Sequence, residues 1–212
     1  MNDDLLNQYL LGTIPASEEW VSKLELYAKE HHVPIMDPVS MHFLQQLIRI
    51  HEPAHILEIG TAIGYSALRM LQANPNAFIT TIERDAERFN YALDEIKSQD
   101  KLERINVVYG DALEVAEKIT GQSSFDLMFI DAAKGQYKRL FELYSPSIQK
   151  GGLIISDNVL FKGYVANPSD DNPRSTKIAN KIKNYNNWLI NNENFHTTIV
   201  PIGDGIAISI KR

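Results

Sequence analysis

The chain has 212 residues and a formal net charge of −6, from 21 Lys and Arg against 27 Asp and Glu. Its length suits one α/β domain, and this balance argues against a basic surface that wraps duplex nucleic acid. The absence of cysteine excludes disulfides, thiolate zinc sites and cysteine nucleophiles. No apolar run nears the roughly 18 residues that span a bilayer, and the N-terminus is acidic, unlike a secretory signal. We therefore expect a single domain over residues 1–212, in the cytoplasm and without a membrane partner.

The first fifty residues predict a helical segment ahead of the main domain. Ser17 is a candidate N-cap, because the two glutamates that follow it would meet the positive end of a helix dipole. Asp37 followed by Pro38 is typical of a second helix start, with Asp at the cap and Pro at the first helical position. We expect residues 1–50 to pack as helices against the remaining chain.

From residue 55 to residue 212, short β-branched runs alternate with helical stretches, which predicts βαβ units and a mainly parallel sheet. The expected strands are 55–60, 78–83, 105–109, 125–131, 153–157, 196–202 and 206–210. The helices between them are expected after Asp85, after Asp111, over 135–148 and over 174–190. No helix separates the last two strands, and Gly203-Asp204-Gly205 between them indicates a hairpin. The expected fold is Rossmann-like α/β, with seven strands and a C-terminal antiparallel hairpin.

The first strand runs into a turn that suits a bound ligand. Gly60 and Gly64 allow a tight backbone approach, and Ser66 with the free N–H groups of the next helix can hold an anion. A dinucleotide fingerprint would need glycine at positions 62 and 65, where Ala62 and Tyr65 stand. A nicotinamide-dependent oxidoreductase is thus a weaker alternative, and an ordinary strand-to-helix turn is another.

Acidic residues end the next two strands. Glu83 can accept both ribose hydroxyls of a nucleoside cofactor, and Asp111 can meet an adenine amino group or cap the next helix. Together these features resemble the class I S-adenosylmethionine (SAM)-dependent methyltransferases. The resemblance implies that the methionine carboxylate lies at the Gly60–Ser66 turn, the ribose on Glu83 and the adenine near Asp111 and Ala112.

Strands four and five also end in polar residues: Asp131 with Lys134 three residues later, and Asp157-Asn158. Ligands bind beyond the carboxyl ends of strands in open α/β sheets, so these side chains should converge beside the cofactor. Two carboxylates and an amide oxygen suit Mg²⁺ or Mn²⁺, and Lys134 can act as a base. Each residue alone is more typical of a helix cap or a turn, and only their joint occurrence favours a site.

These motifs resemble the cation-dependent O-methyltransferases, which include catechol and caffeoyl-coenzyme A O-methyltransferases, over most of the chain from His32 onward. The resemblance implies a divalent metal on Asp131, Asp157 and Asn158, catalysis by Lys134 with Asp131 beside the cofactor, Met36 over the cofactor, and a homodimer. Plant members carry Trp and Asp where this chain has Phe161 and Ala133, which argues against a phenolic ester substrate.

Within that family, residues 31–36, 131–137, 157–163 and 201–205 resemble the bacterial tRNA 5-hydroxyuridine methyltransferases. The resemblance implies formation of 5-methoxyuridine at the wobble position of the tRNA anticodon loop. The segment 162–183 supports a tRNA partner, because it holds five basic residues (Lys162, Arg174, Lys177, Lys181 and Lys183) against Asp170 and Asp171. The alternatives are a solvated helix face, O-methylation of a small catechol-like phenol, and a non-catalytic tRNA-binding module.

Overall fold

The structure, a computed structural model, describes residues 3–121, 124–167 and 173–212. The helices are α1 (Asp3–Thr13), α2 (Glu19–Glu30), α3 (Pro38–His51), α4 (Tyr65–Ala73), α5 (Ala86–Ser98), α6 (Ala116–Thr120), α7 (Tyr137–Tyr144) and α8 (Pro173–Ile190). Two 3₁₀ turns, η1 (Lys134–Gln136) and η2 (Ser145–Ser147), flank α7. The strands are β1 (His55–Ile59), β2 (Phe78–Glu83), β3 (Ile105–Tyr109), β4 (Phe125–Ile130), β5 (Ile148–Ser156), β6 (Phe195–Val200) and β7 (Ile206–Lys211).

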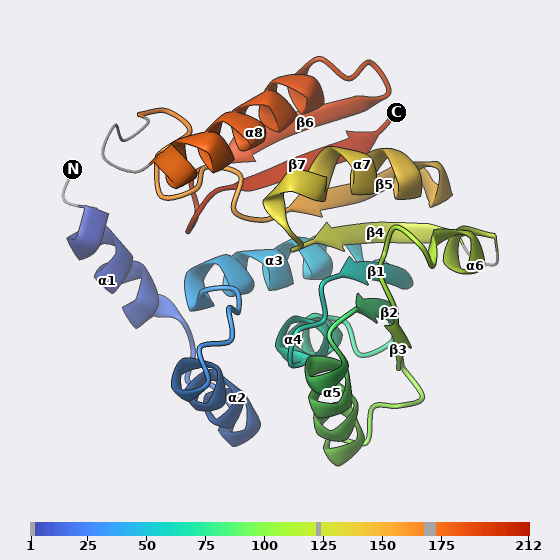
Figure 1. The fold of residues 1–212 in the computed structure, drawn as a ribbon. Helices are drawn as coiled ribbons and strands as arrows, with labels where there is room; N and C mark the ends of the chain where they lie inside the picture. The colour runs from blue at the N-terminus through green and yellow to red at the C-terminus, as the bar shows by residue number, and fades with distance from the viewer. Residues whose placement is uncertain (1–2, 122–123, 168–172) are drawn as a thin grey trace.

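The seven strands form one sheet in the order β3-β2-β1-β4-β5-β7-β6 (Figure 1). Strands β1 to β5 pair in parallel, whereas β7 lies antiparallel between β5 and β6. The expected Rossmann-like sheet with a C-terminal antiparallel hairpin is confirmed. Because strands β1 to β5 all point the same way, their carboxyl ends meet at one edge, where ligands bind in such sheets.

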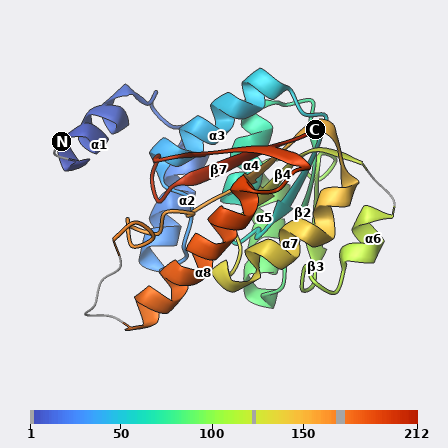
Figure 2. The same cartoon turned by 90° about the horizontal axis from the view of Figure 1, so that it is seen from above.

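Alternate residues along the strands supply two hydrophobic cores, one on each face of the sheet. Ile56, Ile79 and Phe129 pack with α2 to α5 on one face, whereas Leu57 and Met128 pack with α6, α7 and α8 on the other. Helix α1 projects away from this layered body in both views (Figures 1 and 2). No helix in the described part of the chain is long and apolar enough to cross a membrane.

The cap residues explain where several helices begin. Asp37 accepts hydrogen bonds from the Val39 and Ser40 N–H groups, and Asp85 caps α5 in the same way, as expected. The prediction for Ser17 is wrong, because α2 begins at Glu19 with Glu18 in the N-cap position and no side-chain cap. The Glu18 carboxylate instead accepts hydrogen bonds from the side chains of Trp20 and Gln72.

Two predicted elements have different bounds in the structure. The helix expected over 135–148 is split into η1, α7 and η2, and the last of these contains Pro146, which lacks a backbone donor. Strand β5 begins at Ile148 rather than at residue 153. The strand runs through Gly151 and Gly152, although adjacent glycines are typical of a turn. Its register against β4 shifts at these glycines.

Candidate active site

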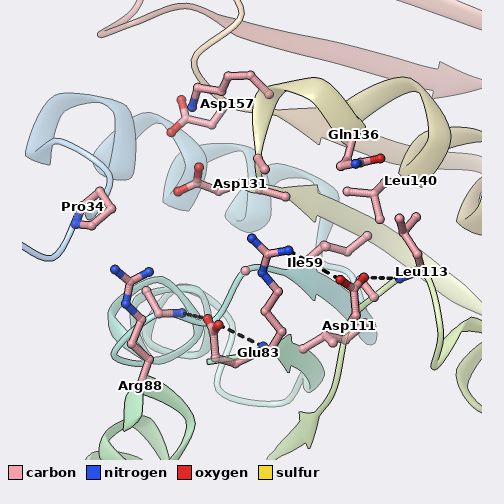
Figure 3. A pocket seen from close by; sticks show the side chains of 18 of the residues that line it. Pro34, Ile59, Glu83, Arg88, Asp111, Leu113, Asp131, Gln136, Leu140 and Asp157 are labelled. Carbon is pink, nitrogen blue, oxygen red and sulfur yellow. Dashed lines mark hydrogen bonds and ion pairs between the residues drawn. The ribbon is translucent and has the colours of Figure 1, made fainter. Parts of the chain in front are cut away.

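A cavity of about 400 Å³ lies at the carboxyl ends of the parallel strands (Figure 3). This volume falls in the usual range for a small-molecule site. The predicted site residues that line it are Gly60, Glu83, Asp111, Ala112, Asp131, Lys134, Asp157 and Asn158. The carboxylates of Glu83 and Asp111 lie toward one end, and those of Asp131 and Asp157 toward the other. The structure therefore brings the expected cofactor side and the expected chemical side into one cavity.

Gly60 allows the ends of β1 and β4 to approach each other. Its φ is +109°, and a Cβ there would lie 3.0 Å from the carbonyl carbon of Asp131 and against its oxygen. The Asp131 N–H donates to the Ile59 carbonyl at 3.0 Å. A side chain at position 60 would push Asp131 away, so the glycine fixes one of the proposed metal ligands as well as the cofactor turn.

Glu83 holds the turn after β1 in place. One carboxylate oxygen accepts the Ala62 N–H at 2.8 Å, and the other accepts the N–H groups of Arg84 and Asp85 at 2.9 Å each. Ala62 has a φ of +46°, which residues with a Cβ rarely adopt. These bonds occupy most of the acceptor sites of the carboxylate, so Glu83 shapes the turn and leaves limited capacity for a ribose.

Asp111 and Ala112 form the next part of the wall. Asp111 accepts the Leu113 N–H at 2.9 Å and lies 3.5 Å from an Arg84 guanidinium nitrogen. It therefore caps a local turn, one of the two roles that the sequence left open. The Ala112 carbonyl accepts the Tyr144 hydroxyl at 2.6 Å, which ties this loop to α7.

Glu58 is a buried carboxylate under the same turn. The Thr81 hydroxyl donates to one of its oxygens at 2.6 Å, and the other oxygen has no hydrogen-bond partner among the described residues. Burial raises the pKa of Glu58 to about 7, against the opposing effect of the neighbouring Ser66 and Thr81 hydroxyls. Ser66 itself, expected to hold an anion, is not among the residues that line the cavity.

The half-buried Asp131 and the buried Asp157 form a pair of acids at the other end of the cavity. Burial raises the pKa of both carboxyls, and the Asp157 pKa reaches about 7 because the Asp131 charge adds to the effect. The Lys134 charge lowers both pKa values. The buried Tyr137 hydroxyl donates to the Asp157 carbonyl at 3.0 Å and holds that backbone in place.

Lys134 and Asn158 are in direct contact. The Lys134 ammonium donates to the Asn158 side-chain oxygen, and it also lies 5.8 Å from the centre of the Tyr137 ring. Asn158 has a φ of +54°, and its N–H donates to an Asp157 carboxylate oxygen at 2.7 Å. The proposed base and two proposed ligands thus form one connected group.

The donor chemistry of this group fits a divalent cation. Asp131 and Asp157 supply two carboxylates, with the Asp131 charge raising the pKa of Asp157, and Asn158 supplies an amide oxygen. Within the described ranges no three His, Cys, Asp or Glu side chains gather as a metal site. Oxygen donors of this kind suit hard cations such as Mg²⁺.

The structure does not bring Met36 to the cavity. Met36 is buried in the core beneath α3, whereas its neighbours Pro34 and Ile35 line the cavity wall. The resemblance indicated the right segment but not which side chains face inward. The sequence reasoning also missed Arg84, which lines the cavity directly after Glu83 and pairs with Asp111. Its position at the end of β2 is the signal that would have found it.

The basic segment is divided between two sides of α8. Lys177 and Lys181 are four residues apart and line a groove on the exposed face, whereas Lys183 lies roughly 120° around the helix from Lys177. The Lys181 ammonium is 3.4 Å from the position of a Cβ built on Gly135, in the η1 turn. This face of α8 is therefore continuous with the turn that carries Lys134. Asp170 and Asp171 lie outside the described residues.

Comparison with known proteins supports this interpretation of the fold. The strand order and the antiparallel β7 are those of the Rossmann-like class I methyltransferases. A solved Staphylococcus aureus protein, described as a "putative caffeoyl-CoA O-methyltransferase", is 35% identical, with a TM-score of 0.92 over 98% of this chain and 100% of its own. The caffeoyl-CoA O-methyltransferase of Stellaria longipes is 27% identical over 98% of this chain and 90% of its own. An O-methyltransferase from Bacillus cereus, solved in complex with S-adenosylhomocysteine (SAH), is 23% identical, with a TM-score of 0.84 over 98% and 97% of the two chains.

Residues 16–212 match the O-methyltransferase family. The chain belongs to that family. Membership favours methyl transfer over the nicotinamide-dependent alternative.

Proposed function

We propose that this protein transfers the methyl group of SAM to a hydroxyl oxygen in a reaction that needs a divalent cation. The observation that carries this proposal is the group formed by Asp131, Lys134, Asp157 and Asn158 at one end of the cavity. Glu83 and the Gly60 turn form the other end, where a nucleoside would lie. The Bacillus cereus relative with bound SAH supports the choice of donor.

Different residues of the chain have different roles in this reaction. Asp131, Asp157 and Asn158 would hold Mg²⁺ or Mn²⁺, and a bound divalent cation lowers the pKa of a hydroxyl beside it. Lys134, in contact with Asn158, is the side chain placed to accept the hydroxyl proton. The acceptor oxygen then forms the new O–C bond while the C–S bond of the sulfonium breaks, which leaves SAH. Tyr137 fixes the Asp157 backbone and so preserves the alignment on which the rate depends.

We further propose that the acceptor is 5-hydroxyuridine at the wobble position of tRNA, giving 5-methoxyuridine. Its 5-hydroxyl and O4 carbonyl present two adjacent oxygens, as a catechol does, so both fit the same cation. The exposed Lys177 and Lys181 beside η1 support a substrate that carries phosphates. A tRNA substrate places the reaction in the cytoplasm. A small catechol-like phenol is the second candidate, because curated relatives such as the Stellaria longipes enzyme act on caffeoyl-coenzyme A.

Replacement of Asp157 by alanine tests the reaction class. Loss of a group that only supports a metal ligand costs about 10–100-fold, so removal of a ligand should lower methyl transfer by at least about 100-fold. Binding of SAH, measured by calorimetry, should be unchanged because Asp157 lies at the other end of the cavity from Glu83. Full activity of this variant in the presence of EDTA would contradict the metal role.

Nucleoside mass spectrometry of tRNA tests the substrate. A strain that lacks the gene should lose 5-methoxyuridine and accumulate 5-hydroxyuridine, and the purified wild-type protein with SAM and Mg²⁺ should restore the modified nucleoside in that tRNA. Catechol and caffeoyl-coenzyme A serve as competing acceptors in parallel reactions. Unchanged 5-methoxyuridine in the strain would defeat the tRNA assignment and leave the phenol candidate.

A further inference from the structure

The turn between β6 and β7 contacts the segment that follows Asp157 and Asn158. The Gly205 carbonyl accepts the Val159 N–H at 2.9 Å. The Asp204 carbonyl accepts the N–H groups of Leu160 and Phe161 at 2.8 and 3.2 Å. Three consecutive backbone donors of one segment are therefore satisfied by two residues about 45 positions away in the sequence.

The segment held by this turn has an unusual backbone. Asn158, Phe161 and Lys162 have φ values of +54°, +47° and +54°. Side chains with a Cβ rarely adopt this left-handed conformation, and it persists where the surrounding structure holds it in place. The opposite side of the segment is also held, because the buried Asn186 of α8 donates to the Val159 carbonyl at 2.8 Å.

The turn packs tightly on both of its sides. Gly205 has a φ of +87°, and a Cβ there would lie 2.7 Å from the Leu160 Cβ and 2.8 Å from its Cδ1. A Cβ on Gly203 would lie 3.2 Å from the Asp37 carboxyl carbon at the start of α3. The turn thus lies between the residue 34–37 segment, part of which lines the cavity, and the segment after Asn158.

We propose that the 203–205 turn is a positioning element for the metal side of the site. By holding Val159, Leu160 and Phe161, it keeps Asn158 in the left-handed conformation that directs its side-chain oxygen to Lys134. Without this contact the segment would relax toward ordinary φ values and the amide would leave the group. The inference rests on the proposed function for its consequence in catalysis.

Gly205→Ala tests this role, because the added methyl group would drive Leu160 and the turn apart. Gly151→Ala is the matched control: Gly151 has a similar φ of +80°, but nothing lies within 4 Å of its Cβ position. The double variant Gly205→Ala/Leu160→Gly removes the Leu160 Cβ, Cγ and Cδ1 atoms and so leaves room for the methyl group. It keeps the test valid if the single variant fails to fold.

We expect Gly205→Ala to speed hydrogen exchange at the Val159, Leu160 and Phe161 amides. It should weaken Mn²⁺ binding, measured by electron paramagnetic resonance, and lower kcat by about 10-fold or more, the scale of a lost support for a metal ligand. SAH affinity should be unchanged. Gly151→Ala should show none of these effects, and the double variant should recover slow exchange and Mn²⁺ binding.

Two results would overturn the inference: unchanged exchange and Mn²⁺ affinity in Gly205→Ala, or equal losses in Gly151→Ala. Failure of the proposed function gives a different result. In that case the wild-type protein transfers no methyl group to any acceptor, while hydrogen exchange at Val159, Leu160 and Phe161 still reports on the turn.

Discussion

At the residue scale, Glu83 and Gly60 shape the cavity wall through contacts with the protein backbone. Glu83 bonds to three backbone N–H groups and supports the positive φ of Ala62. Gly60 lets β1 and β4 meet at Asp131. A substitution at Gly60 would therefore affect both ends of the cavity, although this position was predicted for the cofactor end alone.

Glu58 makes stability depend on pH. Below about pH 4.5 its carboxyl is protonated in both the folded and the unfolded chain. As the pH rises, the carboxyl ionises near pH 4.5 in the unfolded chain but only near pH 7 in the folded chain. Wild-type stability should therefore fall as the pH rises from 4.5 to 7, because only the unfolded chain gains the charge over that interval. Glu58→Gln removes this loss. At about 1.4 kcal/mol per pKa unit, the variant should gain about 3 kcal/mol over the wild type between pH 4.5 and pH 8.

Urea unfolding at several pH values measures this difference. The exposed Glu193, replaced by glutamine, is the control and should follow the wild type at every pH. A gap between the Glu58→Gln and wild-type proteins that does not change with pH would show that Glu58 titrates alike in both states.

At the element scale, α8 separates basic residues that the sequence groups together. Lys177 and Lys181 lie in the groove beside η1, whereas Lys183 lies on the other flank of the helix. The charge summed over segment 162–183 is therefore larger than the charge that one bound ligand can contact. Helical geometry, rather than composition, decides which of these cations a substrate near Lys134 can reach.

Replacing both Lys177 and Lys181 by glutamine tests whether this face of α8 binds phosphates. The variant should raise KM for tRNA and reduce the salt dependence of binding by about two units of slope, one for each lost phosphate contact. Methylation of free catechol should be unaffected. Lys183→Gln is the matched control. If the double variant retained wild-type salt dependence, tRNA would have to bind elsewhere.

At the scale of the whole molecule, α1 is the element that the rest of the fold does not cover. It projects from the body (Figures 1 and 2), and its large apolar side chains are exposed: Leu5, Leu6, Tyr9, Leu10 and Leu11. Tyr9 is 69% exposed. A contiguous apolar surface of this kind on one short helix is typical of an interaction site.

We propose that a second copy of the chain covers α1 in a homodimer. Light scattering should give a mass near twice the 24.0 kDa of one chain, and replacing Leu6 and Tyr9 by aspartate should reduce it to that of the monomer. Leu102→Asp, at an exposed apolar residue away from α1, is the control and should remain dimeric. A wild-type protein that is monomeric at micromolar concentration would refute the proposal.

The sequence by itself determined the sheet, its antiparallel ending and which strand ends meet at the cavity. Gly60, Glu83, Asp111, Asp131 and Asp157 all stand at strand ends, and parallel strands bring their carboxyl ends to one edge whatever the details of packing. The hydrophobic periods that define strands and helices are local, so they can be read along the chain.

Only the tertiary structure decided what each of these residues contacts. Side-chain direction decides that Met36 is buried while its neighbour Pro34 lines the cavity. Two other contacts join segments that are distant in sequence: the Ala62 N–H donates to Glu83, and the Leu160 N–H donates to the Asp204 carbonyl. No periodicity encodes such contacts. They follow from close packing, in which the position of each side chain depends on all its neighbours at once.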